Sequence, residues 1–115
     1  MKFKSNVRIK FLYPAMAEIM NAIQLASPPG YEPTITSAND GKRTNKKSLH
    51  YKDLAYDVRV KDFPGFGLQE FEETKFIIYD WIEKIKVHLQ KPNDFDLVFG
   101  DKKHKNHIHC EWDVK

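Results

Sequence analysis

The 115-residue sequence contains one cysteine, Cys110, which excludes an internal disulfide. Its apolar runs are much shorter than the roughly 20 residues that a membrane-spanning helix needs. The first residues are basic, but the apolar stretch of a secretory signal does not follow them. We therefore expect no membrane span, and synthesis in a reducing cytoplasm without a signal peptide.

The sequence also lacks a strong excess of charge of one sign. The net charge of +3 is compatible with an anionic partner but does not require nucleic acid, and we expect no nucleic-acid binding. Hydrophobic residues make up 41% and aromatic residues 13%, which is typical of a folded protein. The length predicts a single domain over residues 1–115, with one modest core.

Two segments, about 14–25 and about 69–90, carry apolar residues at helical spacing. The first has Pro14 in its first turn, and the Pro-Pro-Gly cluster at 28–30 ends it. Pro92 ends the second and longer helix. The sequence therefore predicts two principal helices.

Short strands are predicted over residues 34–36, 54–60, 95–99 and 107–112. In the last of them the odd positions are polar and the even positions are apolar, which is the alternation of a half-buried strand. A helix, two strands, a second helix and two more strands follow in this order along the chain. This order predicts an α+β fold with a small, mainly antiparallel sheet.

Four of the five histidines and one aspartate form the most informative pattern. His107 and His109 are two residues apart and share one face of the predicted strand. Pairing of this strand with the strand that contains Asp57 would bring His50, Asp57 and His109 around one point. Imidazole and carboxylate are normal ligands of catalytic zinc, which uses three protein ligands and leaves a position for water. His107 is the natural proton acceptor beside them, and His104 is another.

These residues resemble the signatures of a peptidase family. Ser48, His50 and Asp57 match S-x-H, six residues and D, and His107-Ile108-His109 matches a terminal H-x-H. Both signatures are found in the zinc D-Ala-D-Ala carboxypeptidase and L-alanyl-D-glutamate endopeptidase family. The likeness is best to small single-domain members of phages and prophages, and covers roughly residues 14–113. It implies a hedgehog-like fold.

The resemblance also implies roles for individual residues. His50, Asp57 and His109 would be the zinc ligands, and His107 would be the catalytic base or the group that stabilises the transition state. Substrate-binding roles would fall to two more residues, Arg43 and Ser48. Many members place a glutamate three residues before a ligand histidine, whereas this sequence has Asn106 before His109 and His104 before His107. Asp53 stands where the family usually has glycine.

The implied function is zinc-dependent hydrolysis of peptide bonds in peptidoglycan stem peptides by metal-activated water. Whether the enzyme would be a carboxypeptidase or an endopeptidase is left open. The expected protein is a monomer that acts on the bacterial cell wall. If a phage encodes it, it would reach the wall through a holin, within a virion or after lysis.

Two other functions compete with this prediction. One is a non-catalytic zinc-binding domain of the same fold, which the missing glutamate favours. The other is a non-haem iron oxygenase, since two histidines and one carboxylate also bind iron, but the sequence has too few strands for a jelly roll. Beside the site, Cys110 is expected to be buried. Glu111 is expected to face solvent, and orientation of an imidazole is its alternative role. His88, in the long helix, is expected to be structural or at the surface.

Overall fold

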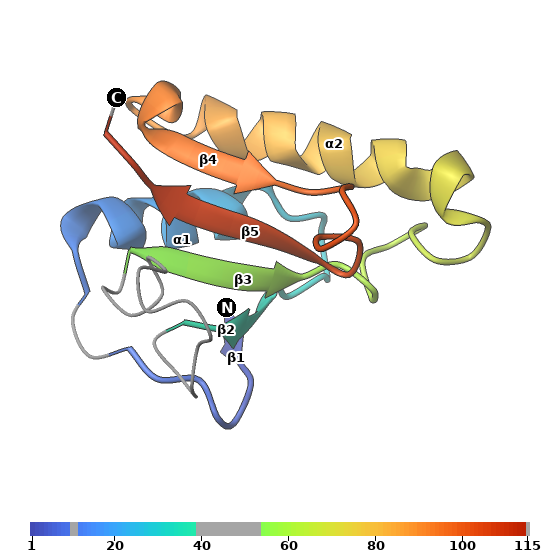
Figure 1. Ribbon diagram of the computed structural model, residues 1–115, viewed down its shortest axis with the longest axis horizontal. Helices are drawn as coiled ribbons and strands as arrows, with labels where there is room; N and C mark the ends of the chain where they lie inside the picture. Colours follow the sequence, from blue (N-terminus) through green and yellow to red (C-terminus); the bar gives the residue numbers. More distant parts are fainter. Residues whose placement is uncertain (10–11, 39–53, 115) are drawn as a thin grey trace.

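Two helices cover one face of a β-sheet in this computed structural model, which describes residues 1–9, 12–38 and 54–114 (Figure 1). The protein is α+β, and its described residues form a five-stranded mixed sheet with the strand order β1-β2-β3-β5-β4. The strands are β1 (Lys2–Phe3), β2 (Thr34–Ser37), β3 (Ala55–Arg59), β4 (Phe95–Val98) and β5 (His107–Trp112). The helices are α1 (Pro14–Ala26), α2 (Phe71–Val87) and a 3-10 turn, η2 (Pro92–Asp94).

The two principal helices and four strands confirm the predicted order of elements. β5 has the predicted bounds, and each of the others lies within about three residues of its predicted segment. The sequence did not predict β1, which has only two residues and therefore no alternation to detect. β1 pairs in parallel with β2, which makes the sheet mixed, while the other three pairings are antiparallel, as expected.

Both helices bury one apolar face in a common core. Pro14 begins α1, where a missing N–H costs nothing, and this helix buries Met16, Ile19 and Ile23. At its end, the Ser27 hydroxyl donates a hydrogen bond to the carbonyl of Ile23. The buried residues of α2 are Thr74, Ile78, Trp81, Ile82 and Ile85. The core lies between the two helices and the side of the sheet that faces them.

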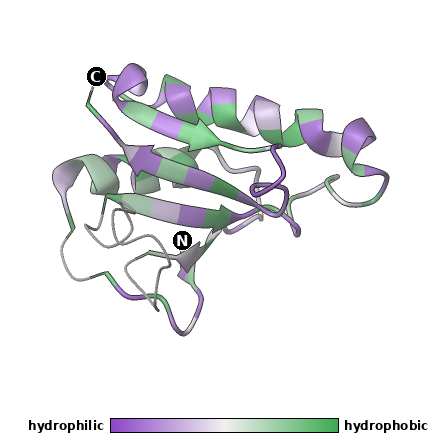
Figure 2. Ribbon diagram, in the orientation of Figure 1, coloured by the Kyte–Doolittle hydropathy of each residue, from purple (hydrophilic) through white to green (hydrophobic). Residues whose placement is uncertain are grey.

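Alternation along β3 and β5 separates an apolar face of the sheet from a polar face. The pairs Tyr56–Cys110 and Val58–Ile108 lie directly opposite each other and are fully buried in the core. Between them, Asp57 lies opposite His109 on the other face. Figure 2 shows the alternation of hydrophilic and hydrophobic residues along β5. The same register that buries the core thus gathers the polar residues on the uncovered face.

The turn between β4 and β5 is fixed to α2 at Gly100. The N–H of Gly100 donates a hydrogen bond of 2.7 Å to the carbonyl of His104. Gly100 has a φ of 98°, which favours glycine, and a Cβ there would overlap the hydroxyl of Tyr79 on α2. That hydroxyl donates to the carbonyl of Phe99. Glycine at position 100 therefore allows the turn that carries His104 to close against α2.

A helix that crosses a bilayer must be long and apolar. Within residues 1–9, 12–38 and 54–114, no helix could cross a membrane.

Replacing Ile85 with alanine should destabilise the protein by about 2–5 kcal/mol, because it leaves a cavity beneath α2. Ile85 is fully buried, whereas Val87, two residues later on the same helix, is 80% exposed. The matched variant Val87→Ala should change the free energy of unfolding by less than about 0.5 kcal/mol. Urea unfolding of both variants measures the difference, and equal effects would contradict the burial of this face.

Candidate metal centre

The centre of the polar face is a pair formed by Asp57 of β3 and His109 of β5. Antiparallel pairing places the two residues opposite each other, and Asp57 Oδ1 lies 3.0 Å from His109 Nδ1. Both side chains are largely buried, with exposed fractions of 15% and 18%. The predicted pairing of these strands is confirmed. The role of the two residues as metal ligands stays a prediction.

Glu111 holds the other side of the His109 ring. Its Oε1 lies 2.6 Å from His109 Nε2, and its side chain is only 23% exposed. The expectation that Glu111 faces solvent was therefore wrong, and its contact with His109 agrees with the alternative, orientation of an imidazole. The signal was present in the sequence, because Glu111 follows His109 by two residues and must share its face. When Nε2–H donates to Glu111, Nδ1 is directed at Asp57. Metal-binding histidines typically have such a carboxylate hydrogen-bonded to the ring nitrogen that does not bind the metal.

The two carboxylates also control the charge of His109. Burial lowers the pKa of the imidazole, but the hydrogen bonds to Asp57 and Glu111, together with their negative charges, outweigh burial and raise the pKa above its ordinary value of 6.5. Both ring nitrogens therefore favour a proton in the metal-free protein. In the metal-free protein a proton on Nδ1 lies between the ring and Asp57, and a metal ion bound to both atoms would replace that proton.

His107 lies beside this pair, on the same face of β5. Its Nε2 is 3.8 Å from Asp57 Oδ1, and its Nδ1 is 2.7 Å from Asn106 Oδ1. An amide oxygen only accepts, so Nδ1 of His107 is the donor. In a neutral ring Nε2 is then the basic nitrogen, and it is directed toward Asp57. In the sequence, Asn106 stands out only where many members of the resembling family have glutamate, and no pattern predicted its contact with His107.

His104 brings a third imidazole to the same place. Its ring centroid lies 5.2 Å from that of His107 and 5.6 Å from that of His109. Asp101 anchors the ring through a 2.6 Å contact between Oδ1 and Nδ1. The turn therefore positions His104 next to the pair, as a catalytic role would require. That role itself stays a prediction.

Three predicted site residues, Arg43, Ser48 and His50, lie outside the described residues. Their roles as substrate-binding residues and as a zinc ligand stay predictions. Cys110 is fully buried on the opposite face, as expected, and burial raises the pKa of its thiol far above the usual range. His88 caps the end of α2 and is exposed, in agreement with its expected surface position.

The donor chemistry of the pair fits zinc. Two ligands bound at 2.0–2.2 Å to one tetrahedral ion lie roughly 3.3–3.6 Å apart, and the donor atoms of Asp57 and His109 are 3.0 Å apart. A small separation of these side chains would therefore accommodate the ion. His107, with Nε2 on the Asp57 side, is close enough to act on a ligand of that ion.

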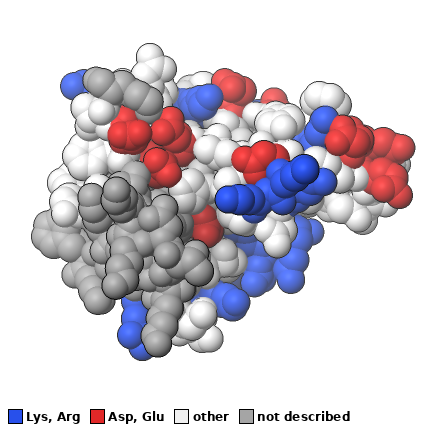
Figure 3. Space-filling view, in the orientation of Figure 1, with Lys and Arg blue, Asp and Glu red and all other residues white. Residues whose placement is uncertain are grey.

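A second group on this face contains only carboxylates. Asp96, Glu111 and Asp113 have oxygen atoms within 4.8 Å of one another, and they form the one such cluster of at least three acid, histidine or cysteine side chains among the described residues. Figure 3 shows acidic side chains gathered over the end of β5 and basic ones over its beginning. A set of carboxylates without imidazole is not typical of zinc.

Comparisons with known proteins identify no family. No protein-family model matches this sequence, and no curated protein matches it.

In the metal-free protein, protonation of His109 should stabilise the fold. Because the folded pKa is raised, this stabilisation is fully present below the unfolded pKa of about 6.5 and is lost as the pH rises through the folded pKa. Urea unfolding in the presence of a chelator, from about pH 5 to about pH 9, measures this loss. Glu111→Gln removes one of the two charges and should reduce the loss. Equal pH profiles for the two proteins would contradict the assignment.

Replacing Asn106 with alanine should change the tautomer of His107. With Asn106 present, neutral His107 should carry its proton mainly on Nδ1. Without the acceptor, the share of the Nε2–H tautomer should increase. Imidazole ¹⁵N chemical shifts measure the two populations in chelator-treated protein. Asn93→Ala in η2 is the matched control and should leave His107 unchanged, and an unchanged tautomer in Asn106→Ala would show that the contact does not orient the ring.

Proposed function

We propose that this protein is a zinc-dependent peptidase that hydrolyses peptide bonds in peptidoglycan stem peptides, with a hedgehog-like fold. The observation that carries the proposal is the Asp57–His109 pair, which Glu111 brackets on one side and His107 flanks on the other. The likeness of Ser48, His50 and Asp57, and of the terminal H-x-H, to the family signatures supports it independently of the geometry.

The metal would be held by Asp57 and His109, with His50 as the third ligand by resemblance. Zinc bound there would polarise the scissile carbonyl and lower the pKa of a bound water. Glu111 fixes the ring of His109 so that Nδ1 stays directed at Asp57. Such a carboxylate behind a ligand histidine increases the basicity of the ligand and holds it in place.

His107 would accept the proton during hydrolysis. Asn106 holds its Nδ1–H, so that Nε2 is the basic atom and lies on the Asp57 side. An imidazole is suited to this step because its pKa lies near neutral pH. The ring of His104 is adjacent and would be the second candidate. Arg43 and Ser48 would contact the substrate, as the resemblance implies.

The substrate would place the protein at the bacterial cell wall. We propose that it acts there as a monomer, and that a phage-encoded protein would reach the wall through a holin, in a virion or after lysis. These points depend on the family resemblance. The mild positive charge suits an anionic polymer such as a cell wall.

A non-catalytic zinc-binding domain of the same fold is the second candidate. The observation that favours it is Asn106, which stands three residues before His109 where many relatives of the resembling family have glutamate. An amide cannot accept a proton as a carboxylate does. In this alternative the pair would bind metal, but His107 would have no part in hydrolysis.

Mass spectrometry of purified muropeptides incubated with the protein tests the proposal. The wild type with zinc should produce new fragments, and a chelator should abolish them. His107→Ala should lower the turnover by roughly 10²- to 10⁴-fold while zinc is retained. His109→Ala should lose both zinc and activity. Zinc content is measured by elemental analysis of the same samples.

His88→Ala is the matched control, because His88 is an exposed histidine at the end of α2. It should retain both zinc and activity. If the zinc-loaded wild type produces no new fragments, the peptidase function is refuted and the non-catalytic zinc-binding domain becomes the preferred function. Full activity in His107→Ala would refute only its role as proton acceptor. Zinc retained undiminished by His109→Ala would refute the metal centre itself.

A further inference from the structure

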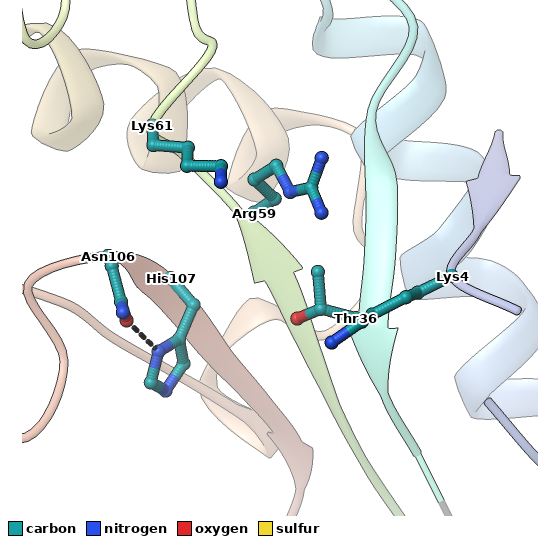
Figure 4. Close-up of a pocket in the computed structure, with 6 residues that line it drawn as sticks. All are labelled: Lys4, Thr36, Arg59, Lys61, Asn106 and His107. Carbon is teal, nitrogen blue, oxygen red and sulfur yellow. Dashed lines mark hydrogen bonds between the residues drawn. The ribbon is translucent and has the colours of Figure 1, made fainter. Parts of the chain in front are cut away.

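A basic cleft adjoins the metal centre at the beginning of β5. It has a volume of about 370 Å³ and is lined by Lys4, Thr36, Arg59, Lys61, Asn106 and His107 (Figure 4). Figure 4 shows Arg59 and Lys61 on one side of the opening, Lys4 reaching over Thr36 on a second side, and the Asn106–His107 pair on a third. We call these six residues the basic cleft.

Strand pairing brings the lining residues together from distant parts of the chain. Arg59 ends β3 and lies opposite His107 on β5. The backbone N–H of Lys4 donates a hydrogen bond of 2.9 Å to the carbonyl of Ile35, which continues the parallel pairing of β1 with β2. Lys4 is thereby held beside Thr36. The cleft depends on the short strand β1, which no sequence pattern predicted.

Positive charge is concentrated in the cleft. Three of its six lining residues are cationic and none is acidic. Within the part of the chain that the structure describes, Lys4, Arg59 and Lys61 form no ion pair with a carboxylate. Like charges around one opening repel each other, and a bound anion would relieve this repulsion. The site therefore selects for negative charge.

Two of the lining side chains suit an oxyanion in particular. The guanidinium of Arg59 presents paired N–H donors that match carboxylate or phosphate oxygens. Asn106 uses its Oδ1 on His107, so its amide NH₂ remains a donor at the edge of the cleft. Cations combined with neutral donors are the usual composition of an oxyanion site.

We propose that the basic cleft binds an oxyanion, either a carboxylate or a phosphate group, through Lys4, Arg59 and Lys61. His107 belongs to both the cleft and the metal centre, with Nε2 at 3.8 Å from Asp57 Oδ1. An anionic group in the cleft therefore positions whatever is attached to it next to Asp57 and His109. This positioning rests on the proposed function, whereas anion binding does not.

The test is a titration of the chelator-treated full-length protein with inorganic phosphate and with acetate at constant ionic strength, followed by ¹H–¹⁵N NMR. The backbone signals of Arg59, Lys61 and His107 should shift in a saturable manner. Arg59→Gln should weaken binding by roughly tenfold or more, since it removes charge-assisted hydrogen bonds. Lys61→Gln, at an exposed position outside the core, should weaken it roughly threefold. The tighter of the two probes identifies the preferred oxyanion.

Lys84→Gln is the matched control, because Lys84 lies on α2 on the covered side of the sheet. It should leave the affinity unchanged. The proposal is overturned if neither probe saturates, if both cleft variants bind as the wild type does, or if Lys84→Gln weakens binding as much as they do. Because the titration needs neither metal nor turnover, its result is separate from the muropeptide assay. Anion binding without peptide cleavage would refute the proposed peptidase function and support the proposed oxyanion site.

Discussion

The antiparallel register between β3 and β5 is the constraint on which the candidate site depends. On the core side it sets Tyr56 opposite Cys110, and on the other side it sets Asp57 opposite His109. A slip of one residue would turn a whole strand over, moving histidines into the core and apolar side chains out of it. Burial of apolar surface beneath the helices therefore holds the carboxylate against the imidazole. The register between β3 and β5 thus determines both the packing of the core and the geometry of the site.

The polar face of the sheet carries charge of opposite sign at its two ends. Asp96, Glu111 and Asp113 cluster where β5 ends, and Arg59 and Lys61 lie near its beginning (Figure 3). His109 lies between these ends, and His107 lines the basic cleft. Such a gradient of potential would orient a dipolar ligand along β5, with its negative end toward the basic cleft. The charge distribution would therefore determine how a ligand is oriented on this face as well as where it binds.

The sequence predicted those parts of the structure that depend on periodicity. The alternation in β5 predicted its bounds and the shared face of His107 and His109, and helical spacing predicted α1 and α2. The same alternation places Glu111 and His109 on one face of β5. Their contact could not be predicted, because it depends on side-chain conformations. The basic cleft could not be predicted, because Lys4 comes to the same cleft as Arg59 only through the pairing of a two-residue parallel strand. His50 lies outside the described residues, so the complete ligand set still rests on the sequence.

Gly100 has a consequence for redesign of the protein. Its backbone conformation and its lack of a Cβ let the turn close against Tyr79, while residues 101–106 project beyond that anchor and deliver His104 and Asn106. Laboratory evolution could vary Lys102 and Lys103, which are exposed, without altering either the core or the anchor. The exposed positions of the turn can thus be substituted, whereas residue 100 must remain glycine.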